Sequence, residues 1–248
     1  MIVGLRASMR RWHAWLAWLV GIPILLWTLS GFVMAARPIA EVRGEALLRA
    51  PHPVSVVAPP VLPNVTGVPL DSLTLEPRAD GPRWVADMPG SAGSRLADPA
   101  TGAWLPPLGA AEAAREVTSR YTGTARIAAV DRITAAHRDV ALRKGLDGWR
   151  VRMTDDTHFY VDRGSGAIVA TRTRFWRFYD FMWGIHIMDL QWRDDPHNPW
   201  IVMLSAMALV LIASGLIVLP PLRRAPLSPP PAAASQAAPT SRRPRRSR

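Results

Sequence analysis

Two histidines are the side chains in this sequence best suited to hold a cofactor in a membrane. His13 stands near the start of an apolar run, next to Trp12, and His186 follows an aromatic-rich segment that contains Trp183. An imidazole buried in lipid costs free energy unless it is paired or ligated, so both are candidate ligands. His13 could instead lie at the membrane surface among tryptophans, where water reaches it.

A second candidate site follows directly on His186. Four further polar side chains come after it: Asp189, Asp194, Asp195 and His197. Nitrogen and oxygen donors at this density could hold a divalent metal, with His186, His197 and Asp189 as predicted ligands. The spacing matches no specific metal motif, and Asp195 could instead cap the turn into the next helix.

The sequence excludes several other chemistries. It has no cysteine, so disulfides, thiolate metal sites, iron–sulfur clusters and thiol catalysis are ruled out. It contains no nucleophile elbow, phosphate-binding loop, dinucleotide fingerprint or zinc-protease motif. We therefore expect no autonomous enzymatic activity.

Two segments are long and apolar enough to cross a bilayer. Residues 12–36 contain no Asp, Glu, Lys or Arg, and a helix of that length rises roughly 37 Å. Pro23 lies inside it, where membrane helices tolerate a kink. A second uncharged run covers residues 198–222. The first run could also be a cleaved signal peptide, because small residues precede Ala36, but its length and its tryptophans favour an uncleaved anchor.

The net charge of +11 lies almost entirely outside these two segments. Ten arginines flank them: Arg6, Arg10, Arg11, Arg223, Arg224, Arg242, Arg243, Arg245, Arg246 and Arg248. The part between the two runs is nearly neutral, which argues against nucleic-acid binding. By the positive-inside rule both chain ends face the cytoplasm, and the central part faces the periplasm from a bacterial inner membrane.

The chain is thereby divided into seven parts. They are a cytoplasmic N-terminus (1–11), a first transmembrane helix (12–36), a proline-rich extended stalk (37–70), a periplasmic domain (71–173), an interfacial amphipathic helix and turn (174–197), a second transmembrane helix (198–222) and a disordered basic cytoplasmic tail (223–248). The arginines of the tail could touch anionic lipid, although holding the topology explains them more simply.

The predicted periplasmic domain contains the same pattern twice. Trp84, Asp98 and Gly102 in the first half match Trp149, Asp162 and Gly166 in the second. Each unit indicates a strand, a turn, a second strand, an Asp-x-x-Thr/Ser-Gly turn and a third strand. Each aspartate could be a catalytic group or a calcium ligand, but an Asx turn is the more common role.

Between the two units, residues 110–121 have the composition of an amphipathic helix. Glu112, Arg115 and Glu116 form its polar face. The predicted fold class is an α+β domain, with this helix on an antiparallel sheet of two degenerate repeats, held by two transmembrane α-helices.

Three segments of the sequence resemble a known family. Residues 11–16, which read RWHAWL, begin an apolar helix that ends in Ser30-Gly31 and looks like the first helix of PepSY-associated transmembrane proteins. Residues 149–166 are similar to the PepSY domain, and residues 175–189 resemble the junction into the next membrane helix. PepSY domains occur in protease propeptides and as extracellular regulatory modules. Larger membrane relatives, including ferric-siderophore reductases, carry more helices and histidine-ligated haem b.

The resemblance implies haem b as a cofactor, with His13 and His186 as ligands and Trp12 and Trp183 beside the porphyrin. The two histidines are expected at opposite faces of a hydrocarbon core roughly 30 Å thick, so one chain cannot clamp one haem between them. A haem would be shared in a homodimer, ligated by His186 and His197, or completed by another membrane subunit.

The leading hypothesis is therefore a haem-dependent or accessory subunit of membrane electron transfer linked to iron acquisition from ferric siderophores. The alternative is a non-redox module that binds a periplasmic, membrane or protease partner. In either case the lipid bilayer is a partner.

Overall fold

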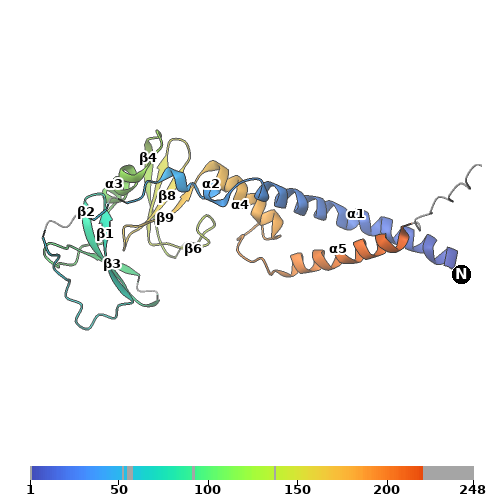
Figure 1. The fold of residues 1–248 in the computed structure, drawn as a ribbon, viewed down its shortest axis with the longest axis horizontal. Coiled ribbons are helices and arrows are strands. Elements are labelled where there is room, and N and C mark those ends of the chain that lie inside the picture. The colour runs from blue at the N-terminus through green and yellow to red at the C-terminus, as the bar shows by residue number, and fades with distance from the viewer. Residues whose placement is uncertain (1, 52, 55–57, 91–92, 137, 220–248) are drawn as a thin grey trace, which may run out of the picture.

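The computed structural model describes residues 2–219, except 52, 55–57, 91–92 and 137. Two long helices form one end of the molecule and two antiparallel sheets form the other, joined by the short helices α2 and α4 (Figure 1). The predicted disordered tail, residues 223–248, lies outside the described residues.

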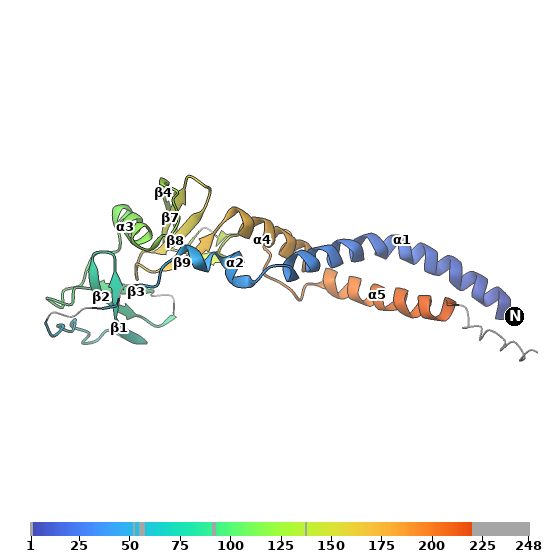
Figure 2. The same cartoon turned by 45° about the horizontal axis from the view of Figure 1, so that its top comes forward.

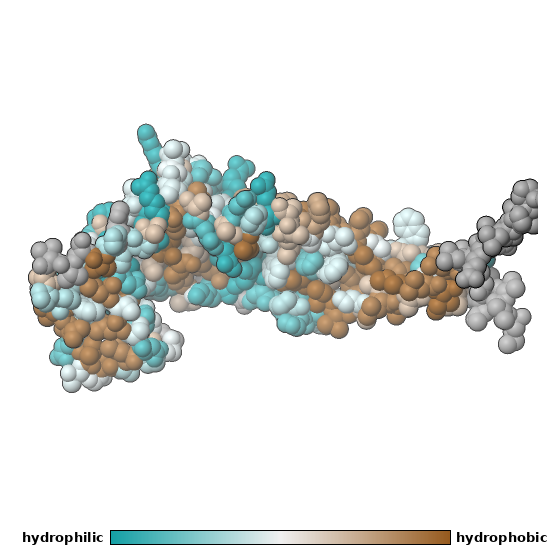
Figure 3. All heavy atoms as spheres, in the orientation of Figure 1, coloured by the Kyte–Doolittle hydropathy of each residue, from teal (hydrophilic) through white to brown (hydrophobic). Residues whose placement is uncertain are grey.

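The two long helices lie side by side, α1 over Ile2–Ala35 and α5 over Pro199–Val218 (Figures 1 and 2). Both are long and apolar enough to cross a membrane. Hydrophobic residues dominate the surface along both helices (Figure 3). The predicted first helix starts at residue 12, ten residues after the observed start at Ile2. A membrane span inferred from hydropathy stops at the first charged residues, but the backbone continues as a helix beyond them.

The sheet end contains a three-stranded and a four-stranded antiparallel sheet, together with a small hairpin. The first sheet has the order β1-β2-β3, from Ser72–Arg78, Gly81–Asp87 and Ser94–Ala97. The second has the order β4-β7-β8-β9, from Ile127–Ile133, Gly148–Met153, His158–Asp162 and Ile168–Arg172. The hairpin pairs β5 (Arg138–Asp139) with β6 (Lys144–Gly145).

Helix α3 (Ala110–Arg120) covers one face of the second sheet, which confirms the predicted helix on an antiparallel sheet. Among the described residues, the core between this helix and the sheet contains six buried side chains: Ala113, Val117, Val151, Met153, Phe159 and Val161. Glu116, predicted to face solvent, is instead buried, and its carboxylate accepts a hydrogen bond of 2.8 Å from the backbone N–H of Ala79. Helical periodicity assigned Glu116 to the polar face, but the turn between β1 and β2 contacts the helix there.

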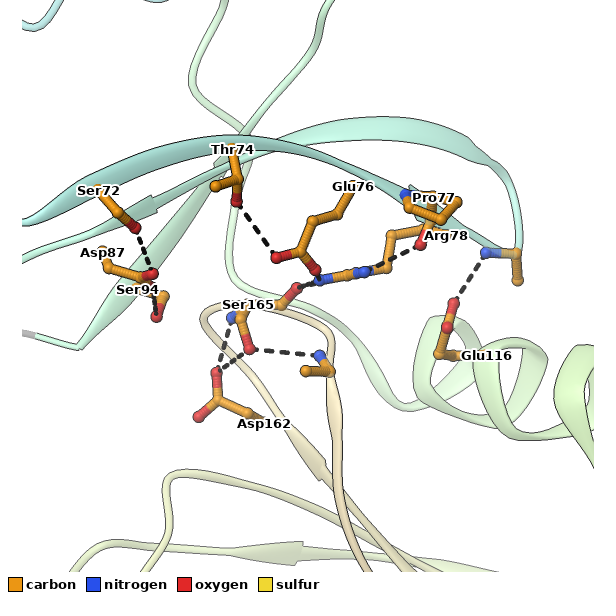
Figure 4. Close-up of polar contacts among 12 residues, drawn as sticks. Ser72, Thr74, Glu76, Pro77, Arg78, Asp87, Ser94, Glu116, Asp162 and Ser165 are labelled. Carbon is orange, nitrogen blue, oxygen red and sulfur yellow. Dashed lines mark hydrogen bonds and ion pairs between the residues drawn. The ribbon is translucent and has the colours of Figure 1, made fainter. Parts of the chain in front are cut away.

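Arg78 joins the two sheets, as Figure 4 shows. Its guanidinium, on β1, donates two hydrogen bonds to the carbonyl of Ser165, in the turn after β8. Within that turn the backbone N–H and the hydroxyl of Ser165 both donate to Asp162. The Asx turn thus positions the carbonyl that receives Arg78.

The two predicted Asx turns are confirmed in closely similar form. Asp98 accepts the N–H of Ala100, and the N–H of Gly102 closes the turn on the carbonyl of Asp98. Gly166 bonds the carbonyl of Asp162 in the same way, and both glycines have φ near +70°. The third strand predicted for the first unit was wrong, because only an isolated bridge between Ala97 and Trp104 is formed there before two prolines interrupt the chain.

The predicted extended stalk, residues 37–70, is not a spacer. It begins with α2 (Ile39–Arg43) and the 3-10 turn η1 (Glu45–Leu47), and α2 contacts α4 and β9. Val42 is buried, and Val61 bonds the carbonyl of Pro99. The prolines prevent a long helix as expected, but they leave the segment free to pack along the domain.

Helix α4 (Arg174–His186) carries the chain from β9 back to the membrane helices. Thr173 caps it by accepting the N–H of Trp176. The predicted helix and turn over residues 174–197 correspond to this helix, which ends at His186, and to the loop that follows it; the helix packs along α1.

Candidate functional site

His13 lies where α1 crosses α5, beside an apolar cavity. Its Nδ1 is 2.8 Å from the hydroxyl of Ser214 on α5, and its Cε1 would lie 3.0 Å from a Cβ added to Gly215. The cavity, of about 620 Å³, is lined by α1 residues from Ser8 to Leu19 and by Val210 and Ser214 of α5. A side chain at position 215 would therefore press on the imidazole and force it to shift.

His186 occupies a comparable place where α4 meets α1. Its Nδ1 lies 3.2 Å from the hydroxyl of Ser30 and 3.1 Å from the carbonyl of Trp27. The ring stacks on Trp27 with 4.8 Å between centroids, and its Cε1 would lie 2.9 Å from a Cβ on Gly31. Both histidines are therefore seated on a Ser-Gly dipeptide of a neighbouring helix.

The hydrogen bonds engage the same nitrogen, Nδ1, of both imidazoles. The hydroxyls of Ser214 and Ser30 also donate to the carbonyls of Leu211 and Trp27. Nδ1 of His186 lies 3.1 Å from the carbonyl of Trp27, which can only accept, so this contact favours a proton on Nδ1 of His186. Because Nδ1 is engaged in both histidines, Nε2 is the nitrogen that could ligate a metal.

The two histidines are far apart. His186 contacts α1 at residues 27–31, so it lies roughly 25 Å along the helix axis from His13 at a rise of 1.5 Å per residue. The four predicted cofactor-binding residues thus divide into two places. Trp12 lines the cavity beside His13. Trp183 does not line this cavity; it lies three residues before His186, and its Nε1 donates to the carbonyl of Arg193.

The three predicted metal ligands are not brought together. Asp189 uses both carboxylate oxygens to accept backbone N–H groups of the loop before α5, from Trp192, Asp194 and Asp195. Those hydrogen bonds, that from Trp192 above all, lower the pKa of Asp189. Among the described residues no group of three His, Asp or Glu side chains could hold a metal ion.

The sequence pattern that defines the PepSY-associated TM region matches residues 10–248. The chain belongs to this family. No curated protein and no solved structure matches it. Family membership and the two apolar helices make it a membrane protein in contact with the lipid bilayer, with a PepSY-type α+β domain attached.

This PepSY-associated chain has one buried ionic cluster that the sequence analysis missed. Asp180 of α4 is 2% exposed and binds both Arg143, from the β5–β6 hairpin, and Arg193, from the loop before α5. Arg143 also donates its Nε proton to the carbonyl of Arg193. The cluster connects the domain to the membrane helices. The sequence feature that could have indicated it is an acidic residue, Asp180, inside an aromatic-rich helix.

Proposed function

We propose that the chain is an accessory subunit of membrane electron transfer, linked to iron acquisition, with haem b ligated by Nε2 of His13. It resides in a bacterial inner membrane with both termini in the cytoplasm. The two sheets face the periplasm, as two degenerate copies of one structural unit.

The observation that carries this proposal is the state of His13 beside the apolar cavity. Ser214 fixes Nδ1, so Nε2 alone is left to ligate, and tryptophan side chains that suit a porphyrin line the adjoining space. About 620 Å³ lies within the range of small-molecule cofactor sites. Bound haem would supply one-electron redox chemistry.

A second protein ligand for the haem would have to come from another chain. Met9 lines the same cavity but stands one turn before His13 on the same helix, so it would lie on the same side of the bound group as His13. His186 is roughly 25 Å away. A second copy of this chain or another membrane subunit would complete the site from the open, lipid-facing side, where Trp12 and Trp15 are about three-quarters exposed.

An absorption spectrum tests the haem proposal. We expect the full chain, purified in detergent after haem-replete expression, to show a Soret band that is lost in His13→Ala. Ser214→Ala should keep the fold and weaken haem retention about 10- to 100-fold, because it frees the ring orientation. A colourless wild-type protein, or equal haem content in His13→Ala and wild type, would overturn the proposal.

A second candidate is a non-redox module that presents its domain to a periplasmic, membrane or protease partner. The observation favouring it is that each histidine already bridges two helices through a serine and needs no cofactor to do so. This candidate predicts that His13→Ala and His186→Ala lower the stability of a colourless protein.

The orientation has its own test, since the chain contains no cysteine. A cysteine replacing exposed Ala111 on α3 should react with a membrane-impermeant maleimide from the periplasmic side. A cysteine at Ser241, in the tail, should react only after the inner membrane is broken. The reverse pattern would place the domain in the cytoplasm.

A further inference from the structure

A cleft of about 640 Å³ lies between α2, β9 and α4, at the junction of the membrane helices and the sheets. Arginine reaches it from three elements: Arg43 from α2, Arg143 from the β5–β6 hairpin and Arg172 from β9. Aromatic rings of α4, among them Trp176, form another wall. The cleft therefore combines fixed cations with an aromatic surface.

Arg172 is held in place without a carboxylate partner. Its Nε donates to the carbonyl of Ala141 at 2.7 Å, its Nη1 donates to the carbonyl of Thr171 at 3.0 Å, and its guanidinium lies 4.1 Å over the ring of Trp176. Within the described part of the chain, no Asp or Glu oxygen is within 4.0 Å of it. Burial, the largest cause, lowers the pKa of this arginine, while the charges of Asp180 and Asp139 act in the opposite direction.

The carboxylates in the cleft wall are already engaged. Asp180 binds Arg143 and Arg193, and Glu45 lies 4.0 Å from Arg43. Three arginines of the wall thus face two carboxylates, one of which also neutralises Arg193. Among these three arginines of the described wall, Arg172 is the one with no ion pair to a carboxylate.

The cleft lies at the level where apolar helix gives way to polar domain. Helix α1 ends at Ala35, and α2 begins at Ile39 in the cleft wall. The other side of α4 exposes Phe175, Phe178 and Phe181, each between 38% and 48%. Exposed aromatic residues at this level are typical of the boundary between lipid tails and water.

We propose that this cleft binds a phosphate oxyanion, supplied by the headgroup of an anionic phospholipid such as phosphatidylglycerol. Arg172 provides charge-assisted hydrogen bonds from its free Nη2, Arg43 closes the outer side, and the glycerol and first acyl carbons lie on the α4 aromatics. The bound lipid would anchor the PepSY-type domain close to the membrane surface. The proposal does not depend on haem.

Native mass spectrometry of the full chain in detergent, with phosphatidylglycerol or phosphatidylcholine added, tests this site. We expect one phosphatidylglycerol per chain to be retained about tenfold more tightly than phosphatidylcholine, and Arg172→Gln to lose about tenfold in affinity, as the loss of one hydrogen bond to a charged group requires. Inorganic phosphate without lipid separates the two sources of the oxyanion. Binding of free phosphate that phosphatidylglycerol does not displace would overturn the lipid assignment.

Arg174→Gln is the matched control, because Arg174 is exposed two residues away, at the start of α4, and is not part of the cleft wall. Equal losses in Arg172→Gln and Arg174→Gln would mean general attraction to anionic lipid and would overturn the site. Should Arg172→Gln fail to fold, Arg43→Gln decides, because that side chain is 63% exposed and its removal does not threaten folding. We expect a severalfold loss of phosphatidylglycerol, and unchanged retention would overturn the proposal.

Discussion

Replacing Gly31 by alanine should loosen the contact between α1 and α4. A Cβ at position 31 would lie 2.9 Å from Cε1 of His186, closer than real contacts allow, and 3.3 Å from Nδ1. The imidazole must therefore move away from α1. We expect this movement to weaken its hydrogen bond to Ser30 and its parallel stacking on Trp27.

The cost follows from those two contacts. A hydrogen bond contributes about 1 kcal/mol net, and an aromatic pair about 0.5–1.5 kcal/mol beyond the area it buries. Alanine regains up to about 1 kcal/mol of helix propensity over glycine. Gly21→Ala is a matched control on the same helix, because nothing lies within 4 Å of the added Cβ. The difference between Gly31→Ala and Gly21→Ala cancels the propensity and should be about 2 kcal/mol.

Unfolding of the full chain in mixed micelles by increasing SDS, followed by tryptophan fluorescence, would measure that difference. In a His186→Ala background the two glycine variants should become equal, because the imidazole that clashes with the new Cβ is gone. Equal stability of Gly31→Ala and Gly21→Ala with His186 present would refute the seating of His186 on Gly31.

Three further predictions concern other buried polar groups. Burial, followed by the charge of Asp139, raises the pKa of Tyr160 from 10.0 to about 12. The neutral phenol therefore contributes fully to folding stability below pH 10, and this contribution is lost as the pH rises from 10 to 12. The wild-type protein should lose up to about 2–3 kcal/mol of unfolding free energy over that range, and Tyr160→Phe should not show this loss. Asp180→Asn should cost about 3 kcal/mol, because two arginines lose their shared carboxylate; denaturation of the two proteins side by side measures it, and a cost under about 1 kcal/mol would contradict the buried cluster. Asn198→Asp should retain the cap of α5 yet lose both hydrogen bonds that the amide donates, to the carbonyls of Ile187 and Asp195. It should therefore be less stable by about 1–2 kcal/mol in the same assay, and a more stable variant would contradict this geometry.

Features fixed by neighbouring residues were predictable from the sequence. The Asx turns at Asp98 and Asp162 depend on a side chain reaching backbone two or three residues ahead, and both form as predicted. Helix α3 follows from composition and periodicity. The burial of Glu116 was not predictable, because it depends on a sheet whose contacting strand ends 38 residues earlier.

The same distinction between local and distant contacts applies to the candidate site. Its histidines stood out by residue type, in an apolar run and at the end of an aromatic segment. The serines that form hydrogen bonds with them did not stand out, because Ser214 is 201 residues from His13 and Ser30 is 156 residues from His186.

The sequence by itself determined the two apolar helices, the distribution of charge around them and the α+β class of the domain between them. Each depends on composition or on periodicity along one segment. Only the tertiary structure decided which polar groups lose water and what replaces it. It separated Asp189 from the histidines, packed each imidazole against a Ser-Gly pair, and placed Arg172 in a cleft whose carboxylates pair with other arginines. The physical reason is that desolvation depends on which distant segments pack together, and nothing within a local stretch of sequence encodes it.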